Sequence, residues 1–328
     1  MRNLTQVSIA LMALAAVVVV TSPASAQDYP KRPITMIVPF PAGGPTDILA
    51  RVLADHLKGS LGEPVVVENV AGAGGSIGTG RVARAQPDGY TLSFGQWASH
   101  VGAGAVYPLQ YDLLRSFEPI ALVANTPLWI IGRNDLAARD LNDLIAWLKG
   151  SPEKASAATV GVGSASHLCG LYLQAHTGTR FQFIPYRGGA PAAQDLIAGH
   201  VDFMCDMASN SLPYVRGGQL KAYAVLSHGR WFAAPEVPTV DELGFQAMYF
   251  SFWHGLWAPR GTPKEIIDKL NGAVVAALSN GDVRARFTDA GQEIPPPAQQ
   301  TPKALGVLQE AEIGKWWPII KAANIKAD

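Results

Sequence analysis

The chain has 328 residues, and its 26 lysines and arginines balance its 26 aspartates and glutamates. This balance excludes the strongly basic surface with which proteins hold nucleic acid, so we expect no nucleic-acid partner. Hydrophobic residues make up 48% of the sequence, which is enough for two packed cores, and the length suits two domains.

The N-terminal segment has the features of a secretory signal peptide. Arg2 precedes an apolar run over residues 7–20, and the sequence Ala-Ser-Ala at 24–26 fits the small-x-small pattern of a cleavage site. We predict that residues 1–26 are removed by cleavage after Ala26. The alternative is an uncleaved membrane anchor, although the run is short for a membrane span. The protein is therefore expected to be exported, and periplasmic where the host has two membranes.

Strand-like and helix-like segments alternate along the rest of the chain. Apolar runs predict strands, and apolar residues at helical spacing behind a helix-start residue predict helices. The expected strands are 34–38, 65–68, 91–94, 120–124, 129–132, 159–162, 181–185, 201–204 and 221–226, and the expected helices are 46–58, 77–85, 141–149, 166–176, 190–198, 263–279, 281–290 and 301–323. This alternation predicts an α/β protein with mostly parallel sheets flanked by helices.

The most informative segment is the glycine-rich loop within residues 37–47. Gly43 and Gly44 follow the first strand, and Thr46 and Asp47 are typical of a helix start. Glycine lets a ligand approach the backbone, and a helix start presents unpaired N–H groups at the positive end of the helix dipole. The loop is therefore predicted to bind an anion, most simply a carboxylate.

Two later segments, 159–167 and 184–191, repeat this order of strand, glycine loop and helix start. In open α/β sheets ligands bind at the C-terminal ends of strands, where such loops lie, so we expect the loops of two lobes to form a cleft. Arg187 could pair with a ligand carboxylate or with Asp206, or it could lie on the surface. Trp97 follows the strand 91–94 and could line the ligand.

No motif for nucleotide, metal or catalytic chemistry is present. The glycine segment near residue 72 fails the dinucleotide pattern at its third position, which is Ile77, and the chain has no P-loop, no Gly-x-Ser-x-Gly and no zinc-type histidine spacing. Ser164, His167 and Asp206 can be combined into a triad, but their spacing alone is weak support. We therefore expect no catalytic residue, no metal ion and no cofactor.

The chain has two cysteines, Cys169 and Cys205. An even number in an oxidising compartment favours a disulfide, and two buried free thiols are the alternative. Closure of the intervening loop is expected to stabilise the fold by about 3–4 kcal/mol in the chain-entropy model.

Several ordered motifs resemble one family over essentially the whole mature chain. They are Tyr29-Pro30 with Arg32-Pro33-Ile34, Val38-Pro39-Phe40-Pro41 with Gly43-Gly44 and Asp47, Val65-Val66-Val67-Glu68-Asn69 with Gly72-Ala73-Gly74-Gly75, Ala85-Gln86-Pro87-Asp88-Gly89-Tyr90-Thr91-Leu92, Ser166-His167, Pro185-Tyr186-Arg187-Gly188-Gly189, Val201-Asp202, Pro235-Glu236-Val237-Pro238-Thr239, and Ala258-Pro259 with Gly261-Thr262-Pro263. With these motifs the chain resembles the extracytoplasmic solute receptors of tripartite tricarboxylate transporters, the Bordetella uptake gene (Bug) family.

The resemblance implies a two-lobe, Venus-flytrap periplasmic-binding-protein fold. Lobe I would comprise residues 27–124 and 231–328, and lobe II residues 125–230. Such a receptor, expected as a monomer, would capture a small carboxylate between its lobes and deliver it to a large and a small membrane subunit. A solute sensor that feeds a signalling partner is one alternative, and an exported α/β hydrolase is another.

The resemblance also implies which residues surround the ligand. In the family, loops matching residues 40–47, 163–167 and those after 186 act from the two lobes. A tryptophan stands here where small residues are common, which suggests an aromatic or a dicarboxylic acid as the ligand. The expected ligand-binding residues are Phe40, Ala42, Gly43, Gly44, Thr46, Asp47, Trp97, Ser99, Gly163, Ser164, Ser166, His167, Arg187, Gly188 and Asp206.

Overall fold

The computed structural model describes residues 29–323 except 153 and 247. The predicted signal peptide and its cleavage site lie outside the described residues. Within the described part of the chain, no helix is both long and apolar enough to cross a membrane.

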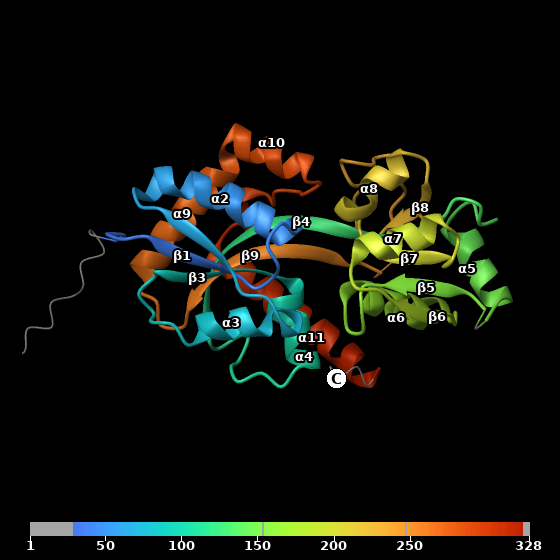
Figure 1. The fold of residues 1–328 in the computed structure, drawn as a ribbon, viewed down its shortest axis with the longest axis horizontal. Helices are drawn as coiled ribbons and strands as arrows, with labels where there is room; N and C mark the ends of the chain where they lie inside the picture. Colours follow the sequence, from blue (N-terminus) through green and yellow to red (C-terminus); the bar gives the residue numbers. More distant parts are fainter. Residues whose placement is uncertain (1–28, 153, 247, 324–328) are drawn as a thin grey trace, which may run out of the picture.

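The described strands form one mixed sheet of nine strands in the order β2-β1-β3-β9-β4-β7-β5-β6, with β8 also paired to β4 (Figure 1). The strands are β1 (Ile34–Val38), β2 (Val65–Asn69), β3 (Thr91–Gln96), β4 (Phe117–Arg133), β5 (Ser156–Thr159), β6 (Gln182–Pro185), β7 (Phe203–Met207), β8 (Leu220–Val225) and β9 (Ser251–Pro259). The α-helices are α2 (Pro45–Leu61), α3 (Ser76–Ala83), α4 (Ala103–Val106), α5 (Leu141–Gly150), α6 (Ala165–Thr177), α7 (Gly189–Ile197), α8 (Ala208–Arg216), α9 (Lys264–Ser279), α10 (Gly281–Asp289) and α11 (Pro302–Ala322). The predicted α/β class is confirmed, but the sheet is mixed where mostly parallel sheets were expected, because β4 and β9 run antiparallel to their neighbours.

The long strand β4 connects two lobes. Its first part, up to Pro127, pairs with β9 beside β1, β2 and β3, whereas its second part, from Leu128, pairs with β7 and β8. We call the first group of strands with its helices lobe I, and the second group with β5 and β6 lobe II. The chain therefore passes from lobe I to lobe II within one continuous strand, where the sequence predicted two short ones.

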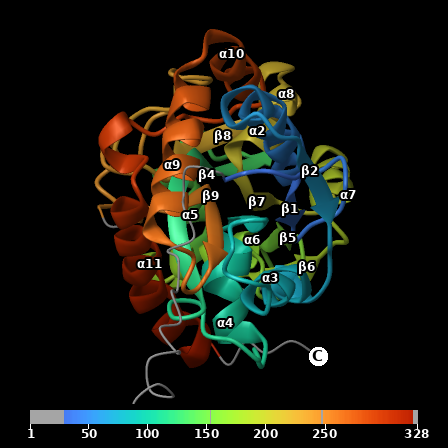
Figure 2. The same ribbon diagram turned by 90° about the vertical axis from the view of Figure 1, so that its left-hand side faces the viewer.

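Each face of the sheet in lobe I is covered by its own helices. Ile34 and Met36 of β1 pack with α2 and α9, and the intervening side chains alternate to the other face. There Ile37 packs in a cluster that includes Val82 of α3 and Trp316 of α11 and continues into lobe II. Figures 1 and 2 show α2, α9 and α10 on one side of lobe I, with α3, α4 and α11 on the other.

The return of the chain to lobe I comes later than predicted. Trp231 and Val237 pack with Trp129 and Val225 in a core cluster of lobe II, although residue 231 was assigned to lobe I. The backbone N–H of Phe250 then bonds to Leu226, directly before β9 begins. This packing was not predicted, because the apolar side chains after residue 226 follow neither strand nor helix periodicity.

Candidate functional site

The loop before α2 is fixed by the carboxylate of Asp47, which lies in the first turn of that helix. Asp47 is 3% exposed, and its oxygens accept hydrogen bonds from the Gly43 N–H at 2.8 Å, Arg51 Nε at 3.0 Å and Asn69 Nδ2 at 2.9 Å. Although burial alone would raise the pKa of this carboxyl, these hydrogen bonds hold it below its usual value. The side chain of Asn69 also donates to the Phe40 carbonyl. The hydrogen bonds of Asp47 therefore fix the conformation of the predicted anion loop.

The first turn of α2 keeps its backbone donors available. Gly44 is the N-cap in extended conformation, makes no side-chain cap bond and is followed by Pro45. The preceding Gly43 has φ +79, a conformation that favours glycine, and a Cβ there would meet nothing within 4 Å. Exposed loop backbone and uncapped N–H groups thus lie together, as an anion site requires.

Thr46 and His254 form a neutral support under this turn. Thr46 Oγ1 lies 3.2 Å from His254 Nε2, and both residues are buried. Burial lowers the pKa of His254 to about 3, so its ring is neutral at ordinary pH. Thr46 was predicted to contact the ligand, and the structure places its hydroxyl against β9 instead.

A cavity of about 290 Å³ lies between the two lobes. Its walls bring Phe40 of lobe I together with Gly163 and Ser164 of lobe II. The remaining lining residues are Gly74, Ala98, Gly102, Ala103, Val106 and Tyr107 from lobe I, and Val160 and Val162 from lobe II. The lining is mostly apolar, and it includes Ser164 at the start of α6.

Gly74 and Ala98 line this cavity but were not among the predicted ligand-binding residues. The glycine segment that includes Gly74 was interpreted as a failed nucleotide motif and as part of the family resemblance, and no ligand contact was predicted for it. Ala98 lies beside the predicted Trp97, but an alanine offers no chemical signal. A larger cavity, of about 770 Å³, is lined by β4, α9 and α11 and the loops beside them in lobe I. It is bounded by one lobe and by no glycine loop, so we assign the site to the cavity between the lobes.

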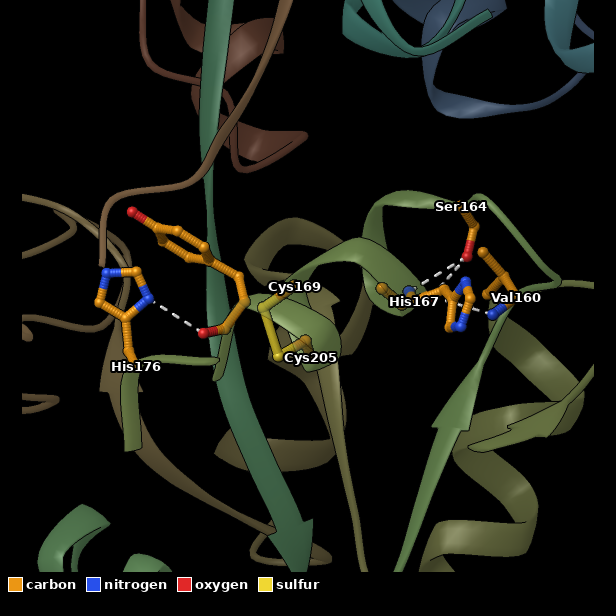
Figure 3. Close-up of a disulfide and its surroundings, with 8 residues drawn as sticks. Val160, Ser164, His167, Cys169, His176 and Cys205 are labelled. Carbon is orange, nitrogen blue, oxygen red and sulfur yellow. Dashed lines mark hydrogen bonds between the residues drawn. A yellow bond between two sulfur atoms is a disulfide. The ribbon is translucent and has the colours of Figure 1, made fainter. Parts of the chain in front are cut away.

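The loop before α6 is closed by its own polar side chains (Figure 3). Ser164 is the N-cap, and its Oγ donates to the Gly161 carbonyl at 2.6 Å and accepts from the His167 N–H at 3.3 Å. Ser166 Oγ accepts from the Val160 N–H at 2.9 Å. These side chains define the shape of the lobe II wall.

The arrangement around Ser164, His167 and Asp206 differs from a catalytic triad. His167 Nδ1 accepts from the Gly163 N–H at 3.1 Å, and the Asp206 carboxylate accepts from Asn210 Nδ2 at 3.0 Å. Burial lowers the pKa of His167. The ring and the carboxylate are thus engaged with other partners than a serine nucleophile. In the described part of the chain, no group of three or more His, Cys, Asp or Glu could hold a metal ion.

Arg187, Gly188 and Asp206 lie at the starts of α7 and α8. Gly188 caps α7 without a side-chain bond, and Arg187 before it is exposed. Asp206 is 6% exposed, and its carboxylate accepts hydrogen bonds from Asn210 and Ser211 rather than from Arg187. Burial raises the pKa of Asp206 to about 6.

Trp97 and Ser99 are core residues, which contradicts their predicted place at the ligand. Trp97 is 0% exposed, its indole N–H donates to Glu312 at 2.8 Å, and its ring packs on Phe250 and Trp316. Ser99 Oγ donates to the Gln96 carbonyl at 3.0 Å and closes a turn. The physical reason is the C-terminal helix, which covers this loop from behind.

The predicted disulfide between Cys169 and Cys205 is present, with Cα atoms 6.0 Å apart (Figure 3). It ties α6 to β7. The helix that starts at the cavity wall is therefore fixed covalently to the strand that carries Asp206.

Comparison with known proteins agrees with this architecture. The profile described as the tripartite tricarboxylate transporter family receptor matches residues 49–325. The periplasmic binding protein BugD is 42% identical, with a TM-score of 0.76 over 91% of this chain and 100% of its own. MatC from Rhodopseudomonas palustris with bound malate is 38% identical, with a TM-score of 0.77 over 89% of this chain and 100% of its own. An R. palustris protein with adipate is 31% identical, with a TM-score of 0.80 over 92% of this chain and 100% of its own. The chain therefore belongs to the tripartite tricarboxylate transporter receptor family, whose members are periplasmic solute-binding receptors and not enzymes.

Proposed function

We propose that this protein captures a small dicarboxylate between its lobes and delivers it to the membrane subunits of a tripartite transporter. The observation that carries the proposal is the cavity lined by both lobes, whose lobe I wall includes Phe40 of the loop that leads to the uncapped start of α2. A ligand that touches both walls stabilises the arrangement in which they face one another, so binding shifts the population toward closure.

The chemistry of the cavity favours an acid with two carboxylates. Val160, Val162 and Val106 offer apolar surface to a hydrocarbon segment, and the first turns of α2 and α7, which have no side-chain cap, offer N–H groups to its charged ends. Two relatives hold malate and adipate, which both have two carboxylates. The aromatic alternative rested on Trp97, and it loses its basis because that ring is buried.

The site residues keep two roles in this proposal. The residues proposed to contact the acid are Phe40 and Gly163, which line the cavity, and Ala42, Gly43, Gly44, Arg187 and Gly188, which lie at or just before the starts of α2 and α7. Thr46, Asp47, Ser164, Ser166, His167 and Asp206 would hold the loops that do so. We further propose that residues 1–26 are a removed signal peptide, and that lobe II runs from residue 128 to residue 250.

Calorimetric titration tests the proposal. The purified exported protein is titrated with malate, adipate, citrate, acetate and glucose, and the dicarboxylates are expected to bind more tightly than the others. Saturable binding of glucose with no binding of any acid would refute the carboxylate assignment.

A matched pair of variants locates the binding site. Val162 lines the cavity and is 65% exposed, whereas Val307 on α11 is 58% exposed and lies outside that cavity. Val162→Asp places a like charge beside the acid and is expected to weaken binding by roughly tenfold or more, and Val307→Asp should leave it unchanged. Equal effects of both substitutions would show that the acid does not bind between the lobes.

A further inference from the structure

A carboxyl group on α11 holds two indole rings behind the cavity. Glu312 Oε2 accepts from Trp97 Nε1 at 2.8 Å and from Trp316 Nε1 at 3.1 Å. Both indoles are 0% exposed, and each ring packs on the other at 5.6 Å and on Phe250. Two buried N–H groups would lose their partner if this carboxyl were removed, which is costly.

The first of these indoles supports the lobe I wall of the cavity. Trp97 directly precedes Ala98, which lines the cavity. Its ring also packs against Gly102 of the same wall, where an added Cβ would lie 3.0 Å from the indole. The position of the ring therefore fixes the π-helical turn Ala98–Gly102 that faces lobe II.

The second indole reaches the other lobe. Trp316 packs on Tyr172 of α6 with ring centroids 5.3 Å apart. Lys315 Nζ lies 5.2 Å from the centre of the same Tyr172 ring and donates to the Tyr249 carbonyl at 2.8 Å, just before the chain returns to lobe I. Figure 1 shows α11 ending between α4 and α6. Because Ser164 of the lobe II wall caps the start of α6, the helix connects this contact to that wall.

We propose that Glu312 is a positioning residue for ligand capture: it joins the Trp97 side of the cavity to α6 through Trp316 and favours the arrangement in which the walls face each other. This inference rests on the proposed capture function. Glu312 does not line the cavity, so its effect on affinity passes through the population of the facing arrangement.

The test combines affinity with a measurement that needs no ligand. Glu312→Leu is expected to weaken binding of the tightest acid in the panel roughly tenfold, the size expected when hydrogen bonds to a charged group are lost. Glu312→Gln keeps an oxygen that accepts indole N–H groups and should stay close to wild type. Glu310→Leu, an exposed neighbour on the same helix, is the matched control and should change nothing.

Hydrogen–deuterium exchange without ligand decides whether the lobes are coupled. Glu312→Leu should speed exchange both in residues 97–103 and in α6 across the lobe boundary. Tyr172→Leu removes the contact from the lobe II side and should weaken binding, with an effect that is not additive with Glu312→Leu. It also serves as the test if Glu312→Leu fails to fold.

Two results would overturn the inference. One is unchanged affinity of folded Glu312→Leu or Tyr172→Leu, and the other is faster exchange confined to α11 and residues 97–103. If wild type binds no acid, the proposed function fails, whereas the exchange measurement still decides whether Glu312 couples the lobes.

Discussion

Replacement of Asp206 by asparagine is expected to stabilise the protein at pH 8. The carboxyl is 6% exposed, and burial raises its pKa from 3.8 to about 6 despite hydrogen bonds from Asn210 and Ser211. A pKa that is higher in the folded state means that the folded protein binds the proton more tightly than the unfolded chain. Its contribution is therefore fully present below pH 3.8 and is lost as the pH rises through 6.

The size of the effect follows from the shift. At about 1.4 kcal/mol for each pKa unit, a shift of roughly two units costs the folded state about 3 kcal/mol at pH 8. Asparagine removes the buried charge and keeps an oxygen for Asn210, whose Nδ2 lies 3.0 Å from the carboxylate. One weakened hydrogen bond would reduce the gain by about 1 kcal/mol.

Urea unfolding at pH 8 and at pH 4 measures the difference. Asp206→Asn should raise the free energy of unfolding by about 2–3 kcal/mol at pH 8 and by little at pH 4, where the wild-type carboxyl is already protonated. Asp289→Asn, at an exposed position on α10, is the control and should stay within about 0.5 kcal/mol at both values. A variant that is less stable than wild type at pH 8, or equally stabilised at both values, would refute the argument.

Three further changes probe the scaffold of the site. Replacement of Cys169 and Cys205 by alanine opens a loop with sequence separation 36, so urea unfolding should show a free energy of unfolding lowered by about 4 kcal/mol. A decrease below about 1 kcal/mol would contradict the chain-entropy model. Asp47→Ala leaves the loop before α2 without the carboxylate that accepts its hydrogen bonds, so calorimetry should show the affinity for the acid lowered roughly tenfold. Unchanged affinity would show that Asp47 does not support the binding site. Gly78→Ala places a Cβ 2.6 Å from a backbone oxygen and should destabilise the fold by about 1–3 kcal/mol. Its control is Gly59→Ala in α2, where the Cβ meets nothing within 4 Å and should stabilise the fold by about 1 kcal/mol. Thermal unfolding that ranks the two variants in the reverse order would contradict this packing.

Local signals predicted the parts of the fold that depend on a few adjacent residues. The loop at Gly43 and Gly44 and the helix that follows it depend on backbone freedom and helix-start residues, which act over one turn; the helix was predicted from residue 46 and begins at Pro45. The disulfide was also predictable, because two cysteines leave one pairing.

Features that depend on distant segments were missed. The sequence around Pro127 reads as a break between two strands, but Pro127 pairs with Ser251 in β9, which was not recognised as a strand. Trp97 reads as a cleft residue after a strand, but Glu312 and Trp316 cover it from the far end of the chain. Neither partner could be assigned from local pattern, since both pairings join residues more than a hundred positions apart.

The starts of α2, α6 and α7 differ in what they can offer an acid. At α6 the first turn is occupied by Ser164, whose hydroxyl accepts from the His167 N–H. At α2 and α7 the caps are Gly44 and Gly188, which make no side-chain bond. A serine or aspartate cap would stabilise each helix by only about 0.3 kcal/mol relative to glycine but would occupy the same N–H groups. We therefore expect the carboxylates at α2 and α7, and the apolar segment of the acid along the α6 wall. Gly44→Asp should then strengthen the fold and weaken binding together, and a variant that binds as tightly as wild type would place the acid elsewhere.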